Sequence, residues 1–156
     1  MQKIPPLYIV RSIKQSVQAQ EKSNGAQVVQ KVSSVLLIDD EPGILTILKR
    51  SLELAGMNTY GFTNPVLAVE HFRNNANSYD IVVIDIRMPH MNGFQVARAV
   101  KEIKPDIKIA FATSFEINNK EFKRILPSTK VDAFITKPVK PDKFAEIVNG
   151  VMVNQS

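Results

Sequence analysis

Short strand-like runs and amphipathic stretches alternate along this chain from residue 35 to residue 152. Most of the runs are apolar, rich in β-branched residues and bounded by polar residues, which is typical of strands buried on both faces of a sheet. The stretches between them place apolar residues three and four positions apart, which predicts helices. We expect strands over residues 35–38, 58–61, 80–85, 107–112 and 131–135, helices beginning at Pro42, Pro65, Gly93 and Pro141, and one more helix over about 117–126.

The strict alternation of strands and helices predicts a parallel α/β sheet, because each strand must return through a right-handed helical crossover. Helices then cover both faces of the sheet and give three layers, α/β/α. The doubly wound five-stranded order 2-1-3-4-5 fits this number of elements. We place the domain at residues 34–152, after a flexible basic N-terminal extension at residues 1–33 and before a C-terminal tail at residues 153–156.

The composition is that of an ordinary globular protein. The 156 residues, 44% of them hydrophobic, are enough for one domain with a sizeable core. No stretch approaches the roughly 18 uncharged apolar residues of a membrane-spanning helix, and Pro5, Pro6 and Arg11 interrupt any signal-peptide core. The absence of cysteine excludes disulfides and cysteine-based metal or redox chemistry. These features favour a cytoplasmic location.

The net charge of +5 lies mainly near the N-terminus. Residues 1–34 carry five basic side chains and one acidic side chain, a net charge of +4, and the rest of the chain carries +1. Basic tails can contact nucleic acid or anionic membranes, but these charges are dilute, and a solvated tail is the simpler interpretation. We expect no direct nucleic-acid binding from the domain itself.

Polar side chains stand at the ends of four expected strands. Asp39 and Asp40 follow the first strand, Asp85 ends the third, and Thr113 and Lys137 follow the fourth and fifth. In a doubly wound sheet, ligands bind at the carboxyl ends of the strands, and the switch point here lies between strands 1 and 3. Three carboxylates gathered there would raise one another's pKa unless a cation lay among them.

This set of side chains predicts phosphoryl chemistry. Mg²⁺ binds few carboxylates together with water and phosphate oxygens, and a lysine and a hydroxyl suit a transferred phosphoryl group. An aspartate can attack as nucleophile and form an acyl phosphate. Taken singly, the Asp-Asp pair could cap a helix, and Thr113 or Lys137 could be merely structural. Their joint occurrence at four strand ends favours a phosphoryl-acceptor site with Asp85 as the nucleophile.

The sequence resembles the receiver domain of two-component response regulators over about residues 34–152. The resemblance rests on VLLIDDEP at 35–42, DIRMPHMNG at 85–93, FATS at 111–114 and FITKP at 134–138. It implies the flavodoxin-like receiver fold. It also implies that Asp85 accepts a phosphoryl group from the phosphohistidine of a sensor histidine kinase or phosphotransfer protein.

The resemblance implies a Mg²⁺ site as well. Asp40, Asp85 and the backbone carbonyl of Arg87 would be ligands of the ion, and Asp39 would act largely through water. Arg87 stands at a position that the family uses to tune the lifetime of the phosphoryl group.

The remaining family roles concern the response to phosphorylation. Lys137 would pair with the phosphoryl oxygens, and the Thr113 hydroxyl would shift to hydrogen-bond the phosphate. Phe134 occupies the aromatic switch position, whose ring turns inward as the threonine moves. The Lys137–Pro138 peptide is expected to be cis, which proline makes accessible.

We expect a stand-alone receiver, since no further domain follows the last helix, that signals through a phosphorylation-dependent protein contact. Basic residues gather on the helix at 117–126, the strand at 131–135 and the helix at 141–152. That face is the expected surface for an acidic output partner or for a homodimer. Such a protein is a switch rather than an enzyme, and it catalyses only its own phosphoryl transfer and dephosphorylation.

Two other functions compete with this one. A degenerate receiver would act as a constitutive protein-binding module. A phosphatase-type hydrolase would carry a second aspartate two residues after the nucleophile, where this chain has Arg87, so it is disfavoured. His71 and His90 have no partner at metal-ligand spacing, and both are expected at the surface.

Overall fold

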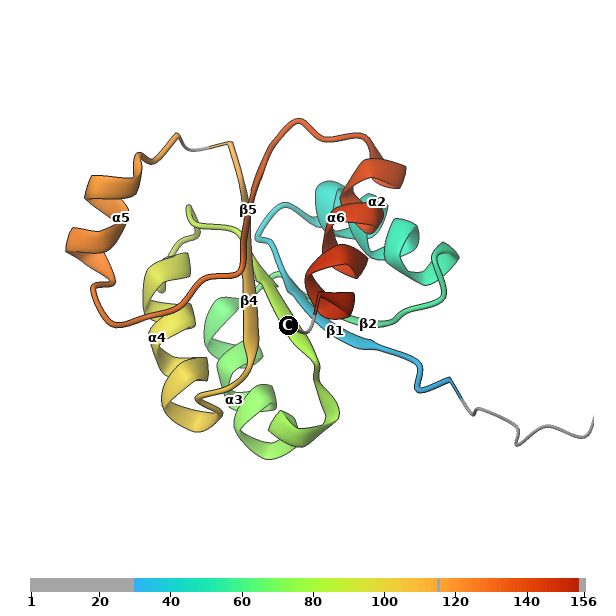
Figure 1. The fold of residues 1–156 in the computed structure, drawn as a ribbon, viewed down its shortest axis with the longest axis horizontal. Coiled ribbons are helices and arrows are strands. Elements are labelled where there is room, and N and C mark those ends of the chain that lie inside the picture. Colours follow the sequence, from blue (N-terminus) through green and yellow to red (C-terminus); the bar gives the residue numbers. More distant parts are fainter. Residues whose placement is uncertain (1–29, 115, 155–156) are drawn as a thin grey trace, which may run out of the picture. The chain divides into compact units, whose positions relative to one another are not determined.

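The computed structural model describes residues 30–114 and 116–154. The sequence prediction of a flexible extension at residues 1–33 therefore lies almost wholly outside the described residues, as do residues 155 and 156 of the predicted tail at 153–156. Within them, five parallel strands form one sheet in the order β2-β1-β3-β4-β5 (Figure 1). The predicted order 2-1-3-4-5 and the predicted parallel sheet are confirmed.

The strands are short and closely follow the apolar runs. Central strand β3 has the sequence IVVI, and all four of its residues are buried. This is the pattern of a strand covered by helices on both faces. In register, Ile38 of β1 pairs with Ile84 of β3, which aligns the carboxyl ends of these two strands. The strands are β1 Ser34–Ile38, β2 Asn58–Phe62, β3 Ile81–Ile84, β4 Lys108–Thr113 and β5 Ala133–Thr136.

The helices begin where proline or a capping side chain predicts them. Pro42, Pro65 and Pro141 each occupy the first turn of a helix, where the missing N–H costs no hydrogen bond. Gly56 directly follows Ala55, the C-cap of the helix that begins at Pro42, and its φ of 86° is the left-handed conformation that often ends a helix. The helices are α2 Pro42–Leu54, α3 Pro65–Asn75, α4 Gly93–Ile103, α5 Asn119–Ile125 and α6 Pro141–Val153, and a 3₁₀ turn covers Ala76–Ser78.

Two elements begin two residues later than the sequence predicted. Helix α5 starts at Asn119 instead of residue 117, because the Asn118 side chain accepts hydrogen bonds from two backbone amides and caps the helix. Strand β5 starts at Ala133 instead of residue 131. The chain before it is held by Asp132, whose side chain accepts a hydrogen bond from the Ile109 amide. Both shifts come from polar side chains that bind backbone groups outside the regular element.

The core consists of two apolar clusters, one on each face of the sheet. Val82 and Ile84 of β3 point into the cluster covered by α3, α4 and α5, and Ile81 and Val83 point into the cluster covered by α2 and α6. Figure 1 shows these two helical layers on opposite sides of the strands. The predicted three-layer architecture is confirmed. None of the helices in the described parts of the chain is long and apolar enough to cross a membrane.

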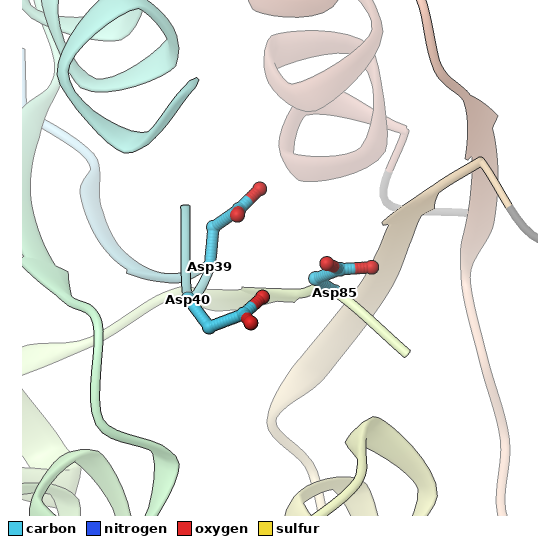
Figure 2. Close-up of side chains that lie close together, drawn as sticks. All are labelled: Asp39, Asp40 and Asp85. Atoms are coloured by element: carbon cyan, nitrogen blue, oxygen red, sulfur yellow. The ribbon is translucent and has the colours of Figure 1, made fainter. Parts of the chain in front are cut away.

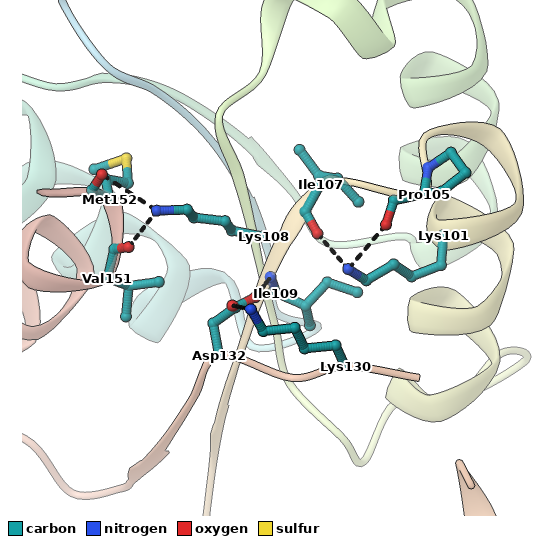
Figure 3. Close-up of polar contacts among 9 residues, drawn as sticks. All are labelled: Lys101, Pro105, Ile107, Lys108, Ile109, Lys130, Asp132, Val151 and Met152. Carbon is teal, nitrogen blue, oxygen red and sulfur yellow. Dashed lines mark hydrogen bonds and ion pairs between the residues drawn. The ribbon is translucent and has the colours of Figure 1, made fainter. Parts of the chain in front are cut away.

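At the amino end of the sheet, lysine side chains donate hydrogen bonds to backbone carbonyls (Figure 3). The Lys101 ammonium donates to the Ile107 carbonyl at 2.6 Å, and the Lys108 ammonium donates to the Val151 carbonyl at the end of α6, also at 2.6 Å. Burial lowers the pKa of Lys101, and the nearby carboxylate of Asp132 opposes that shift. These contacts fix helix ends and loops at the end of the sheet that is opposite the acidic residues.

Candidate functional site

The sheet brings the candidate residues together at its carboxyl end. Asp39 and Asp40 directly follow β1, Asp85 directly follows β3, Thr113 is the last residue of β4, and Lys137 directly follows β5. The Asp85 amide donates to the Ile38 carbonyl at 2.9 Å, which extends the β1–β3 pairing as far as the site. The topology therefore places these five side chains as the sequence predicted, at the switch point between β1 and β3.

The three aspartates form one acidic cluster, shown in Figure 2. One carboxylate oxygen from each of Asp39, Asp40 and Asp85 lies within 4.8 Å of the other two. Asp39 and Asp85 are buried, and Asp40 is half-buried. The Asp39 carboxylate also accepts a hydrogen bond from the Glu41 amide at 3.0 Å, which orients it at the start of α2.

Lys137 is the cation of the cluster. Its Nζ lies 2.5 Å from Oδ2 of Asp39 and 3.6 Å from Oδ2 of Asp85, and only 12% of its side chain is exposed. One ammonium among three carboxylates leaves a formal charge of −2. A charge of this size in a half-buried site is costly unless a further cation shares it.

The environment of Asp85 sets its ionisation. Burial raises the pKa of Asp85, the positive charge of Lys137 opposes that shift, and the negative charge of Asp39 adds to it. Hydrogen bonds from the Thr113 side chain and the Arg87 backbone amide also lower the pKa of Asp85. Asp85 is thus a buried carboxylate whose charge depends on several neighbours, which is the setting of reactive acids in proteins.

The donor set fits a hard divalent cation. Three carboxylates within reach of one another offer the oxygen ligands that Mg²⁺ prefers, and the half-buried position leaves room for water. A divalent ion would also cancel the formal charge of −2 that Lys137 leaves. The predicted ligand role of the Arg87 carbonyl stays a prediction, since the contact seen here is made by the amide of that residue.

The loop after Asp85 is held by a close backbone contact that the sequence did not reveal. A Cβ added to Gly93 would lie 2.4 Å from the Asp85 carbonyl oxygen and 2.7 Å from the Ile86 Cα. The Gly93 amide donates to the Ile86 carbonyl at 2.8 Å, and His90 turns the loop with φ of 68°. The Asn-Gly pair signalled only a turn and a helix start. The need for glycine comes from the path of the loop against β3.

The residues of the predicted switch lie next to the site. Thr113 is buried and hydrogen-bonds Asp85, whereas Phe134 is 44% exposed. The Phe134 ring packs against Phe111 and Phe122, with ring centroids 5.7 and 5.0 Å away. The predicted cis peptide between Lys137 and Pro138 is confirmed. The movement of Thr113 and Phe134 on phosphorylation remains a prediction.

The expectation for one histidine was wrong. His71 is half-buried, and its Nε2 lies 2.6 Å from the hydroxyl oxygen of Tyr79. Its ring also lies against Tyr60 and Phe62, with centroid distances of 6.2 and 5.0 Å. These partners come from β2 and from the residue that follows the 3₁₀ turn, so spacing along the sequence could not reveal them. His90 is exposed, as expected.

Known proteins resemble both the sequence and the fold. The chain is 28% identical over 123 residues to the chemotaxis protein CheV1 of Helicobacter pylori, a match covering 75% of this chain and 38% of that protein. It is 36% identical over 81 residues to the response regulator receiver protein CpdR of Brucella abortus, covering 52% of this chain and 66% of CpdR. The chain thus spans less than two thirds of these curated relatives, and only 13% of the sensor kinase CckA of Brucella abortus.

Solved structures of response regulator proteins share the fold of this chain. A response regulator receiver domain protein from Clostridium thermocellum superposes with a TM-score of 0.68 at 25% identity, covering 78% of this chain and 94% of that one. The response regulator protein TrrA from Thermotoga maritima, in complex with Mg²⁺ and BeF, gives 0.65 at 27% identity, covering 77% and 99%. The family profile of the response regulator receiver domain matches residues 35–149. With the strand order, the acidic cluster and this match, the chain belongs to the response regulator receiver domain family.

Proposed function

We propose that this chain is a receiver that accepts a phosphoryl group on Asp85 and signals through a protein contact that depends on phosphorylation. The observation that carries the proposal is the cluster of Asp39, Asp40 and Asp85, in which the Lys137 ammonium pairs with Asp39 and Asp85. Receivers are phosphoacceptor switches rather than classical enzymes, which agrees with the class expected from the sequence. The proposed donor is a phosphohistidine on a sensor histidine kinase or a phosphotransfer protein.

In the proposed transfer, an Oδ of Asp85 attacks the phosphorus of the donor phosphohistidine. The new P–O bond forms as the P–N bond breaks, and the imidazole leaves with the electron pair of that bond. Asp39, Asp40, Asp85 and the Arg87 carbonyl would hold Mg²⁺, which supplies charge neutralisation when bound. Relatives of the chain include a protein solved with Mg²⁺ and BeF, and this supports the assignment.

Lys137 has two successive roles in this proposal. Before transfer, its ammonium is shared between Asp39 and Asp85 and reduces their repulsion. After transfer, it would pair with a phosphoryl oxygen, which carries more charge than the carboxylate it replaces. The Thr113 hydroxyl, which hydrogen-bonds Asp85, would follow the negative charge to the phosphoryl group.

The proposed output is a change on the face formed by α5, β5 and α6. Movement of Thr113 would leave space behind β4, and the half-exposed Phe134 ring on the neighbouring strand would turn into it. A cavity of about 510 Å³ lies between β5, α5 and the loop after β4, and both Thr113 and Phe134 line it. The partner bound by this face would carry acidic side chains, because α5 bears Lys120, Lys123 and Arg124.

The test is the intact mass of the protein after incubation with acetyl phosphate and Mg²⁺. Wild type should gain about 80 Da, the mass of one HPO₃ group, and the gain should disappear on mild alkaline hydrolysis. Asp85→Asn should show no gain. Asp106→Asn, which changes an exposed aspartate far from the cluster in sequence, should behave as wild type.

Two results would contradict the proposal. A mass gain that survives in Asp85→Asn would place the acceptor elsewhere. Absence of any gain in wild type, together with unchanged hydrogen exchange when beryllofluoride and Mg²⁺ are added, would favour the constitutive binding module instead. The beryllofluoride arm is needed because a rapidly hydrolysed acyl phosphate would escape detection by mass.

A further inference from the structure

Strand β2 is an open edge of the sheet. It comes first in the order β2-β1-β3-β4-β5, so it pairs with β1 on one side only. The Asn58 amide donates to the Ser33 carbonyl at 2.9 Å, which shows that the backbone groups of Asn58 are directed toward β1. Backbone groups alternate in direction along a strand, so the N–H and C=O groups of Thr59 and Gly61 point away from β1. Among the described residues, no strand lies on that side of β2.

The β2 edge lacks the charges that usually prevent an edge strand from pairing with another chain. No Lys, Arg, Asp or Glu occurs in residues 54–69, a range that contains the whole of β2. Edge strands in natural proteins are commonly protected by charged side chains or by proline. The other edge strand, β5, is flanked by such residues, since Lys130 and Asp132 precede it and Lys137 follows it. The two edges of the sheet therefore differ in their readiness to pair.

Tyr60 is the exposed side chain at the middle of this edge. Its ring lies on the side of the sheet covered by α3, with ring centroids 6.2 Å from His71 and 5.8 Å from Tyr79. Those contacts leave 55% of Tyr60 exposed. An exposed aromatic ring beside unpaired backbone groups offers an incoming strand both hydrogen bonds and apolar contact.

We propose that the β2 edge is a self-association surface, on which the β2 strands of two copies of the chain pair antiparallel about a two-fold axis beside Tyr60. In this register, Thr59 lies opposite Gly61 of the second copy, and Gly61 lies opposite Thr59 of the second copy. Each of these pairs exchanges backbone hydrogen bonds, which satisfies the outward N–H and C=O groups of both strands. Tyr60 then lies opposite Tyr60 of the second copy, at the position where side chains of facing strands approach most closely.

The symmetry of the edge selects a second copy as the partner. The two-fold axis exchanges the outward groups of Thr59 and Gly61, so the edge is complementary to itself without any shift of register. Because the edge carries no charge, two copies can approach without repulsion, whereas a charged peptide would find no opposite charge on β2 to orient it. Strands β2 and β5 form opposite edges of the sheet. This surface is therefore distinct from the α5–β5–α6 face, where the sequence suggested a homodimer.

The size of the edge predicts a weak contact. A strand of five residues is only about 17 Å long, so its pairing covers far less than the roughly 800 Å² per partner of a stable interface. The dimer is therefore expected at high protein concentration only, and a covalent trap is the sharpest way to detect it. The chain contains no cysteine, so a single introduced cysteine is its only thiol.

The test is disulfide trapping of the full chain carrying Tyr60→Cys, in a glutathione redox buffer. Facing residues of this kind have Cα atoms about 4.5 Å apart, a separation that a disulfide can bridge. The variant should form a covalent dimer of twice the chain mass of 17.5 kDa. The matched control is Ser128→Cys, at an exposed position between α5 and β5, which measures random collision. Tyr60→Cys should cross-link about ten-fold faster than the control or more, because association raises the effective concentration of the two thiols.

Charged side chains at the same position test the pairing without a covalent bond. In sedimentation equilibrium at high concentration, Tyr60→Lys and Tyr60→Glu should each lower the average mass relative to wild type, because like charges would lie directly opposite each other. An equimolar mixture of the two variants should associate again, and Ser128→Lys should behave as wild type.

The outcomes that would overturn the proposal are distinct. They are cross-linking of Tyr60→Cys no faster than that of Ser128→Cys, and a mixture of Tyr60→Lys with Tyr60→Glu that stays monomeric. Thermal melting should show that every variant is folded. Neither measurement depends on phosphorylation of Asp85, so the result is independent of the proposed acceptor role.

Discussion

Tyr79 is a residue whose environment can be tested by pH. Its side chain is 2% exposed, and its hydroxyl oxygen lies 2.6 Å from Nε2 of His71. Burial raises the pKa of Tyr79 to about 12, with a smaller contribution from Tyr60. The unfolded chain ionises near pH 10. The fold therefore favours the neutral phenol, and this stabilisation is present below pH 10 and lost as the pH rises through 12.

The effect of Tyr79→Phe on the free energy of unfolding should change sign as the pH rises. At pH 7 the variant loses the hydrogen bond to His71 and should be less stable than wild type by about 1 kcal/mol. Between pH 10 and 12 wild type alone loses roughly 2–3 kcal/mol, because only its unfolded state can ionise freely. Urea denaturation at several pH values should therefore show two stability curves that cross. Parallel curves would mean that the phenol ionises equally in both states.

Gly93→Ala should destabilise the fold at the loop that carries Asp85. The new Cβ would lie 2.4 Å from the Asp85 carbonyl oxygen, and this backbone atom cannot move freely. We expect a loss of roughly 1–3 kcal/mol in urea denaturation. Gly150→Ala is the matched control. Its Cβ would meet no atom within 4 Å, and alanine is favoured in a helix, so a gain of about 0.5–1 kcal/mol is expected. Equal effects at both positions would contradict this account.

At the residue scale, the sequence could predict which residues form the site but not the contacts that hold the surrounding loops in place. Asp39, Asp85 and Lys137 were identifiable because each follows a strand, and parallel strands align their carboxyl ends. The contact behind Gly93 and the hydrogen bond of His71 depend on how distant segments meet, and no local pattern encodes that geometry.

Helix α5 is the element most dependent on its cap. It has seven residues, and isolated helices of this length are unstable in water. The Asn118 side chain accepts hydrogen bonds from the Lys120 and Glu121 amides at 3.0 and 2.9 Å. The helix begins two residues after the predicted start at about residue 117, because this cap, rather than apolar periodicity, fixes where it begins.

Asn118→Ala should loosen α5 without unfolding the domain. Loss of the cap costs about 1 kcal/mol, so hydrogen exchange of the amides of α5 should accelerate about five-fold while the midpoint of urea denaturation stays nearly unchanged. Asn64→Ala removes the corresponding cap of α3, which packs Ala68 and Phe72 into the core. That control should lower global stability by about 1 kcal/mol. A global loss in Asn118→Ala would show that α5 unfolds only with the rest of the domain.

At the scale of the whole molecule, the architecture could be predicted from the sequence. Alternating strands and helices must be joined by right-handed crossovers, and few sheet topologies satisfy that condition. Residues 35–152 supply every member of the two core clusters among the described residues. An apolar groove of about 800 Å³ between α2 and α6 was not predicted. It is formed by residues that periodicity assigned to helices without showing which of their faces would remain uncovered.

Deletion of residues 1–30 should leave the domain folded. The described core starts at Val35, and the Ser33 carbonyl, which accepts the Asn58 amide at 2.9 Å, is retained. We expect the melting temperature to change by less than about 4 °C, corresponding to less than roughly 1 kcal/mol. A deletion through residue 36 would remove three of the five residues of β1 and should prevent folding. A large loss in the shorter deletion would place part of the stability in residues 1–30.

The strand order also determines which segments must meet before the acidic cluster has its counter-ion. Strand β1 pairs with β3, and this pairing alone brings Asp39 next to Asp85. Lys137 follows β5, an edge strand that pairs with β4, and lies more than fifty residues after the end of β3. The carboxylates and their counter-ion therefore come from segments far apart in the sequence, and the ammonium reaches Asp39 and Asp85 only when β5 is paired with β4. Attraction between these opposite charges favours the docking of this edge strand.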